Sequence, residues 1–251
     1  MKTVLITGCS SGFGLASARY FLEHNWKVIA TMRSPNERLF EASEHLRVLA
    51  LDVTDPSSIQ QVIEAAGPID VLVNNAGIGL LGALEGISME AIRSIFETNT
   101  FGTMAMIQAV LPQFRQRRSG VVVNVTSSVT IKSLPLLSIY TASKAAVNAF
   151  TESLALELEP FNVRMRLVLP GRAPSTDFGK NAQPRMQGSI PEAYSDLAQQ
   201  VFAEWSLSTV VTEAQDVVEA IWRAANDPVS PMRIVAGADA VALESEQSTS
   251  A

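Results

Sequence analysis

Short apolar runs rich in β-branched side chains recur along the chain and alternate with segments of helical spacing. The runs lie at Thr3–Thr7, Lys27–Thr31, Val48–Leu51, Asp70–Val73, Val121–Val125 and Val163–Leu169. Because these runs are apolar throughout, they predict strands that are buried on both faces. Between them, apolar residues recur every three or four positions, as in Leu15–Leu22 and Ile59–Ala66. This spacing predicts amphipathic helices.

Strand followed by helix, repeated, predicts a parallel sheet, and right-handed crossovers place helices on both of its faces. We therefore expect a doubly wound α/β/α architecture. No linker-like stretch divides residues 1–251, which predicts a single domain. The one irregular region runs from Ala173 to about Ser208 and opens with prolines and a glycine. It predicts a mobile flap that ends in an amphipathic helix, and the polar tail Glu244–Ala251 predicts a frayed end.

Composition then narrows the class of protein. The chain has 251 residues, of which 47% are hydrophobic, and a formal net charge of −6. A large core can form, and an acidic surface disfavours nucleic acid as a partner. Cys9 is the only cysteine, which excludes an internal disulfide and a thiolate metal site and favours a reducing compartment. No stretch approaches the roughly 20 apolar residues that span a bilayer, so we expect a cytoplasmic protein without a membrane partner.

A glycine-rich turn follows the first predicted strand and leads into the first predicted helix. It reads Gly8-Cys9-Ser10-Ser11-Gly12-Phe13-Gly14. Glycines at these positions permit a tight turn and a close backbone approach, and the helix N-terminus offers amides to an anion. The turn therefore predicts contacts to the pyrophosphate of a dinucleotide, for which the candidates are Gly8, Ser10, Ser11, Gly12, Phe13 and Gly14. The alternative is a glycine-rich turn that binds no ligand.

The same turn also satisfies the G-x-S-x-G pattern of a hydrolase nucleophile, with Ser10 at its centre. That chemistry needs a histidine late in the chain. The two histidines are His24 and His45, and neither is placed to act as the base. Hydrolysis is therefore disfavoured.

The end of the second predicted strand bears on which dinucleotide is bound. A carboxylate at this point binds the ribose 2′-hydroxyl of NAD, but the chain reads Ala30-Thr31-Met32-Arg33-Ser34. Arg33 suits a 2′-phosphate, and Ser11 offers a further hydrogen bond, so NADP(H) is favoured over NAD(H). Asp52 and Val53, after the third strand, are candidate contacts to the adenine, although Asp52 could equally cap its own turn.

Tyr140 and Lys144 lie four residues apart at the start of a predicted helix and so share one face. A nearby ammonium and a cationic nicotinamide favour the phenolate, so we expect Lys144 and the cofactor to lower the pKa of Tyr140 and to permit acid–base chemistry without histidine. Ser127 follows the predicted strand Val121–Val125. There its hydroxyl lies at the sheet edge where ligands bind. Taken alone, each of these residues could equally be an ordinary surface or turn residue without a catalytic role.

Taken together, the motifs make the chain resemble the short-chain dehydrogenase/reductase family through about Gly237. They are Thr7-Gly8-x-x-x-Gly12-x-Gly14, Asn74-Asn75-Ala76-Gly77, Asn99, Ser127, Tyr140-x-x-x-Lys144 and Pro170-Gly171. Segments 8–12, 30–33 and 75–82 look like the NADP-dependent 17β-hydroxysteroid dehydrogenase branch. The resemblance implies a Rossmann-type sheet.

It also implies roles for the four candidate catalytic residues. Tyr140 would exchange a proton with the substrate oxygen, Lys144 would hold the nicotinamide ribose, and Ser127 would orient the carbonyl or hydroxyl group. Asn99 would hold a water molecule on the proton path to solvent.

Further cofactor contacts implied by the resemblance are Asn74, Ala76 and Gly77 on the adenosine side, and Pro170 and Gly171 near the nicotinamide. The family often carries a threonine five positions after that proline. This chain has Ser175 there and Thr176 one position later, so the choice between the two stays open.

These observations predict an NADP(H)-dependent oxidoreductase that interconverts a secondary alcohol and a ketone, or reduces an aldehyde, on an apolar small molecule. Candidate walls of its pocket are Leu80, Leu81, Leu134, Leu136, Met186, Ile190, Tyr194 and Phe202. An NAD(H)-dependent enzyme of the same family and a dinucleotide sensor without activity are the alternatives. The resemblance further implies a homodimer or homotetramer that assembles through the long helix around Met89–Gln116 and the helix after Tyr140.

Overall fold

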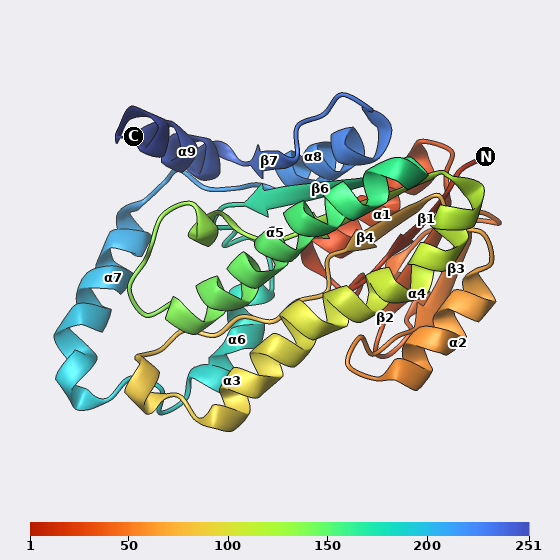
Figure 1. The fold of residues 1–251 in the computed structure, drawn as a ribbon. Helices are drawn as coiled ribbons and strands as arrows, with labels where there is room; N and C mark the ends of the chain where they lie inside the picture. Colours follow the sequence, from red (N-terminus) through yellow and green to blue (C-terminus); the bar gives the residue numbers. More distant parts are fainter. Residues whose placement is uncertain (251) are drawn as a thin grey trace.

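The computed structural model describes residues 1–250, and the side chains of residues 1–247 (Figure 1). Its centre is a parallel sheet of seven strands in the order β3-β2-β1-β4-β5-β6-β7. The strands are β1 Thr3–Ile6, β2 Lys27–Met32, β3 Leu46–Ala50, β4 Val71–Asn74, β5 Gly120–Val125, β6 Val163–Pro170 and β7 Arg233–Ala236. The six predicted strands are confirmed to within two residues at each end.

Strand β7 was not predicted. It has four residues and begins with the exposed Arg233, so its apolar pattern is too short to stand out from the loop before it.

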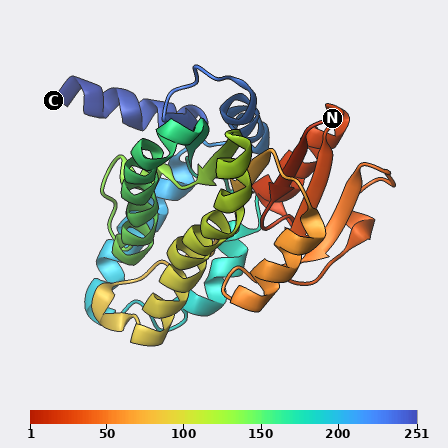
Figure 2. The same ribbon diagram turned by 45° about the vertical axis from the view of Figure 1, so that its right-hand side comes forward.

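Nine α-helices surround the sheet in the described residues. They are α1 Gly12–Glu23, α2 Pro56–Ala66, α3 Met89–Phe96, α4 Gly102–Arg117, α5 Ser138–Leu158, α6 Phe178–Met186, α7 Ser195–Leu207, α8 Ala214–Asn226 and α9 Ala238–Ser250. Helices α1 and α8 pack on one face, and α2, α4 and α5 pack on the other. In Figure 2, α4 (yellow-green) and α5 (green) run side by side on their face. The predicted doubly wound α/β/α architecture is confirmed.

Alternation along each strand explains the two-sided core. In β1, Val4 and Ile6 face α1 and α8, whereas Leu5 faces the opposite helices. All three side chains are fully buried. Successive side chains of a strand point to opposite faces, so a strand that is covered on both sides must be apolar at every position.

The long helix expected around Met89–Gln116 is present as two helices joined by a π-helical turn. This turn spans Glu97–Phe101 and separates α3 from α4. It places Asn99 and Thr100 in the buried interior, against Ser143 of α5. Such local widening of a helix often occurs at functional sites.

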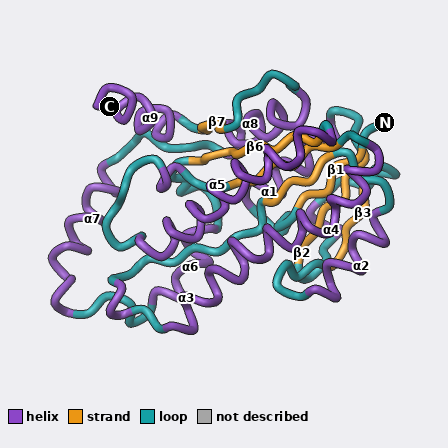
Figure 3. The backbone as a smooth tube through the Cα atoms, viewed as in Figure 1, coloured by secondary structure: helices purple, strands orange, loops and turns teal. Residues whose placement is uncertain are grey.

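The predicted flap contains two helices, α6 and α7, which lie beyond the carboxyl ends of the strands (Figures 1 and 3). The expected amphipathic helix is α7. Helix α6 was not expected, because Pro184 inside it is a strong signal for a chain break.

The polar end of the chain, expected to fray from Glu244, is instead the second half of α9, which extends to Ser250. Glu246 in this half forms an ion pair with Lys132 at 2.9 Å. Because this contact ties α9 to the loop after β5, the expectation of an irregular tail is wrong for the described residues. Ala251 lies outside them.

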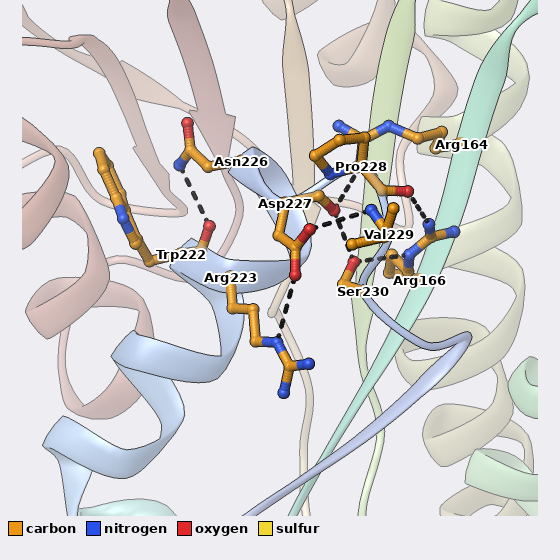
Figure 4. Close-up of polar contacts among 9 residues, drawn as sticks. All are labelled: Arg164, Arg166, Trp222, Arg223, Asn226, Asp227, Pro228, Val229 and Ser230. Atoms are coloured by element: carbon orange, nitrogen blue, oxygen red, sulfur yellow. Dashed lines mark hydrogen bonds and ion pairs between the residues drawn. The ribbon is translucent and has the colours of Figure 1, made fainter.

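Two arginines of β6 hold the end of α8 (Figure 4). Arg164 donates to the carbonyl oxygens of Ala225 and Asp227 at 3.2 and 2.9 Å. Arg166 donates to the hydroxyl of Ser230 at 2.9 Å. The last carbonyls of a helix lack partners within the helix, and cationic donors near that end are favourable.

The first prediction concerns this contact. Arg164→Met removes the two donors and leaves the carbonyls of α8 to water, which should lower the free energy of unfolding by about 1 kcal/mol. Urea unfolding of the variant measures the change, and Arg38→Met, at an exposed arginine, is the control. Equal stability of both variants would contradict a supporting role for Arg164.

Candidate active site

A cavity of about 1800 Å³ opens along the carboxyl edge of the sheet. It lies where the chain, after adding β2 and β3 on one side of β1, returns to add β4 on the other. Such a reversal is the place where open α/β sheets bind ligands. Most predicted site residues line this cavity: Gly8, Ser10, Ser11, Gly12, Phe13, Arg33, Asp52, Val53, Ala76, Gly77, Ser127, Tyr140, Lys144, Pro170, Gly171 and Thr176.

The glycine turn has the conformation that its sequence predicts. Gly8 and Gly12 have φ angles of +74° and +55°, a region that favours glycine. A Cβ on Gly14 would lie 2.3 Å from the carbonyl oxygen of Gly8. Gly14 therefore serves the close packing of the turn rather than the wall of the cavity.

The turn is fastened to the loop after β4. The hydroxyl of Thr7 accepts the amides of Asn75 and Ala76 at 3.0 and 2.9 Å. In return, the side-chain amide of Asn75 donates to the carbonyls of Thr7 and Gly8. These bonds set the spacing between the two loops that flank the cavity.

Of the two adjacent asparagines, only Asn75 lines the cavity. Asn74, which was predicted to contact the cofactor, is 4% exposed and donates to Asn124 at 2.9 Å. Asn124 in turn donates to Thr151 of α5 at 2.8 Å. The structure thus places Asn74 in the packing between β4 and α5, because the last residue of a strand still follows the alternation of the sheet.

Arg33 and Asp52 lie at one end of the cavity. Two hydrogen bonds from Thr54, one from its backbone amide and one from its hydroxyl, lower the pKa of Asp52, and the charge of Arg33 adds to this effect. The Oδ1 atom of Asp52 accepts both bonds, at 2.9 and 2.7 Å. Asp52 therefore caps its own turn, which was the alternative role considered for it. The N-cap of α2 is Asp55.

At the other end, Ser127 and Tyr140 face each other. Burial raises the pKa of Tyr140 to about 12, and hydrogen bonding with Ser127 opposes this rise. The ring of Phe178 from α6 lies 5.8 Å from that of Tyr140, measured between ring centroids. A phenol in this position is held in its protonated form.

Lys144 is 5% exposed, and its ammonium donates to the carbonyl of Val125 at 3.1 Å. Burial lowers the pKa of Lys144 to about 8. The predicted lowering of the Tyr140 pKa, which requires Lys144 together with a cationic nicotinamide, stays a prediction. Both side chains are buried, and burial penalises the phenolate and the ammonium alike.

Asn99 does not line the cavity. Its side chain accepts the amide of Ile78 at 2.8 Å and donates to the carbonyl of Ile78 at 3.0 Å. A third bond joins it to Ser143 at 3.2 Å. Asn99 thereby holds the loop after Gly77 against α5, and its role in holding water stays a prediction.

The loop after β6 is held by residues that the sequence did not single out. Asp239, in the first turn of α9, accepts the amide of Arg172 at 2.6 Å and the hydroxyl of Thr212 at 2.6 Å. It also occupies the space beside Gly171, where an added Cβ would lie 2.1 Å from its Oδ1 atom. No element was predicted between Gly237 and Glu244, so no signal in the sequence marked Asp239 as part of the site.

Thr176, rather than Ser175, lines the cavity, and its side chain packs against Gly12. Thr176 is thus the neighbour of the glycine turn, and which of the two residues contacts the cofactor stays a prediction.

The predicted apolar wall divides into two groups. Leu80, Leu81, Leu134, Met186 and Phe202 line the cavity. Leu136, Ile190 and Tyr194 do not line it and pack instead in the flap cluster, a small apolar cluster that also holds Leu81 and Met186. Trp205, Val210, Ala242 and Leu243 complete the wall without having been predicted.

The residues of the cavity fit a dinucleotide. Ser11, at the N-terminal end of α1, makes no capping bond through its side chain, so the first amides of the helix remain available to an anion. A Cβ on Gly77 would lie 3.3 Å from the ammonium of Lys144, which shows how closely this backbone approaches the predicted catalytic group. A glycine-lined cradle at one end and Ser127, Tyr140 and Lys144 at the other define a dinucleotide-dependent oxidoreductase.

Comparisons with known proteins agree with this class. A family model described as short chain dehydrogenase matches residues 2–187. Human retinol dehydrogenase 8 is 37% identical over 92% of this chain and 80% of its own length. Human 17-beta-hydroxysteroid dehydrogenase type 1 is 41% identical over 66% of this chain and 55% of its own length. The chain thus spans little more than half of the latter relative.

Solved structures agree as well. A short-chain dehydrogenase from Streptomyces avermitilis superposes with a TM-score of 0.83 and 31% identity, covering 100% of this chain and 94% of its own. A serine dehydrogenase complexed with NADP+ has a TM-score of 0.79 and 28% identity, covering 93% of each chain. A 3-ketoacyl-(acyl-carrier-protein) reductase from Brucella melitensis complexed with NADH has a TM-score of 0.78 and 25% identity, covering 93% of this chain and 96% of its own.

The chain belongs to the short-chain dehydrogenase/reductase family, and the expected membership is confirmed. It is an oxidoreductase of the class that binds a nicotinamide dinucleotide. Among the described residues, none of the helices is both long enough and apolar enough to cross a bilayer.

The second prediction tests the cost of burying Lys144. Its pKa is lowered to about 8 from an ordinary value of 10.5. Below pH 8 Lys144 is charged in both states, but the charge is poorly solvated in the folded state and well solvated in the unfolded state. Lys144→Met should raise the free energy of unfolding by roughly 1 to 3 kcal/mol at pH 7. The gain should shrink as the pH rises from 8 towards 10.5, because the folded wild type then holds Lys144 neutral and the cost of removing its proton falls with rising pH.

Urea unfolding at pH 7 and pH 9.5 measures this difference, with Lys27→Met at an exposed position of β2 as control. A gain that is the same at both pH values would show that better packing, rather than the removal of a buried charge, stabilises the variant.

Proposed function

We propose that the protein is an NADP(H)-dependent oxidoreductase that interconverts a secondary alcohol and a ketone, or reduces an aldehyde, on an apolar small molecule. The proposal rests chiefly on one observation: Ser127, Tyr140 and Lys144 line the same cavity as the glycine turn and Arg33. The apolar residues of the flap that line the cavity support an apolar substrate.

The nicotinamide dinucleotide, when bound, supplies or accepts the hydride. Tyr140 donates the proton to the carbonyl oxygen of the substrate during reduction and accepts it from the hydroxyl during oxidation. Since burial raises the pKa of Tyr140 to about 12, the phenol is protonated at neutral pH and ready to act as the acid. In the oxidation direction it must first lose that proton, which a positive charge nearby makes easier.

Ser127 holds the reacting oxygen. Its hydroxyl faces Tyr140 and can donate to a carbonyl oxygen or accept from a hydroxyl group. Lys144 holds its ammonium beside Gly77 and Val125. From there it can bind a ribose hydroxyl and favour the phenolate of Tyr140 when oxidation requires a base.

NADP(H) is preferred over NAD(H) because Arg33 follows β2 and lines the cavity. At this position, NAD-binding proteins with this kind of sheet carry a carboxylate. A guanidinium group is suited to a phosphate and offers nothing specific to a free hydroxyl. Similar structures are complexed with NADP+ in one case and with NADH in another, so the argument rests on Arg33.

We further propose that the chain forms a homodimer or homotetramer. Large apolar side chains on the faces named in the sequence analysis are exposed, among them Phe101 in the π-helical turn at 52% and Leu156 on α5 at 73%. Exposed apolar groups of this size are typical of surfaces that bury themselves against a partner.

The third prediction tests Tyr140 directly. Tyr140→Phe removes the hydroxyl and keeps the ring, so turnover of a ketone with NADPH should fall by about 10²- to 10⁴-fold, while NADPH still binds. Initial rates and a fluorescence titration measure the two quantities. Tyr194→Phe, in the flap cluster, is the control and should retain turnover. Retained turnover in Tyr140→Phe would exclude the role assigned to Tyr140.

The fourth prediction tests the choice of cofactor. Arg33→Asp should replace attraction for a 2′-phosphate by repulsion and offer a carboxylate to a 2′-hydroxyl. The ratio of NADPH to NADH efficiency should therefore fall by about 10²-fold. The rates with each cofactor across a panel of ketones give this ratio, and Arg38→Asp controls for a change in net charge. An unchanged ratio in Arg33→Asp would contradict the contact.

A further inference from the structure

A second arginine, Arg185, lines the same cavity as Arg33. Arg33 follows β2, whereas Arg185 lies in the last turn of α6, in the part of the chain that was predicted to form the flap. No motif in the sequence connects the two residues. The fold brings them close enough for the positive charge of Arg33 to act on Arg185.

The guanidinium of Arg185 is held in place by the backbone. It donates to the carbonyl of Gly79 at 3.1 Å and to the carbonyl of Asn181 at 2.8 Å. Gly79 belongs to the loop after β4, and α6 packs directly on it, since an added Cβ at Gly79 would lie 2.9 Å from the ring of Phe178. Arg185 is therefore fixed over the loop that carries Ala76 and Gly77.

The electrostatic surroundings of the two arginines are only partly balanced, because Asp52 is the carboxylate on which the charge of Arg33 acts. Burial lowers the pKa of Arg185, and the charge of Arg33 lowers it further. The carbonyls of Gly79 and Asn181 that accept from Arg185 are neutral. In the described part of the chain, no carboxylate forms an ion pair with either arginine. Two guanidinium groups in this situation are stabilised by an anion that both can reach.

We propose that Arg185 is a second arginine ligand of the adenosine 2′-phosphate, so that α6 closes on NADP(H) through this contact. The proposal rests on the proposed function, which already places the adenosine end of the cofactor beside Arg33. A phosphate monoester is nearly dianionic at neutral pH and presents three acceptor oxygens, which two guanidinium groups can share. NAD(H) has only a hydroxyl there and gains nothing from Arg185.

The test compares the binding of four probes to Arg185→Met by isothermal titration calorimetry: NADPH, NADH, 2′,5′-ADP and 5′-ADP. Affinity for NADPH and 2′,5′-ADP should fall by about 10- to 100-fold. Affinity for NADH and 5′-ADP should stay within about threefold of the wild type, which is under 1 kcal/mol. Because the ratio of two affinities does not depend on the fraction of folded protein, it stays informative if the variant is less stable.

Two further variants sharpen the result. Arg185→Lys keeps the charge and should recover part of the lost affinity for 2′,5′-ADP. Lys180→Met removes a positive charge from the same helix and should leave the ratio of NADPH to NADH affinity unchanged. An equal fall of that ratio in Lys180→Met would overturn the proposal, because it would show a general effect of charge on α6.

The remaining outcomes separate this inference from the proposed function. Equal weakening of NADPH and NADH in Arg185→Met, or no weakening of either, overturns the role of Arg185 and leaves NADP(H) dependence standing. A wild-type protein that binds NADH more tightly than NADPH overturns the proposed cofactor and the role of Arg185 together.

Discussion

The spacing between the loops after β1 and β4 is the constraint on which the rest of the site depends. Thr7 and Asn75 bind each other's backbone, so the glycine turn and the segment Ala76–Gly77 move as one unit. The reversal of strand order opens a crevice at this point, and these four hydrogen bonds fix its width. Everything that lines the cavity is placed relative to this unit, including Lys144, whose ammonium lies beside Gly77.

The two ionisable groups at the proposed reaction centre are buried at a cost to stability. The pKa of Lys144 is lowered to about 8 and that of Tyr140 is raised to about 12, chiefly by burial in each case. Both shifts oppose the charged forms, so the protein alone holds Tyr140 as an acid. Buried titratable groups in a cavity are a mark of functional sites, and a purely structural core would favour apolar side chains at both positions.

The fold and most of the site follow from local patterns, and what was missed has identifiable physical causes. A single sequence is enough to recognise strands that are buried on both faces and a unit of strand, glycine turn and helix. Asn74 was misplaced because a motif does not say which way each side chain points at the end of a strand, whereas the alternation of β4 buries it. Asp239 and Arg185 escaped notice because their roles depend on contacts with residues far away in the chain.

The cavity is therefore built from two parts with different origins. The sheet edge supplies Ser127 and the glycine turn, and α5 supplies Tyr140; the family match over residues 2–187 covers all of them. Much of the apolar wall comes from Trp205, Val210 and Leu243, which lie beyond that match. Asp239 joins the two parts, because it binds the backbone after β6 from the first turn of α9. The residues of the proposed chemistry thus lie within the matched residues 2–187, whereas the apolar wall combines side chains from inside and outside that match.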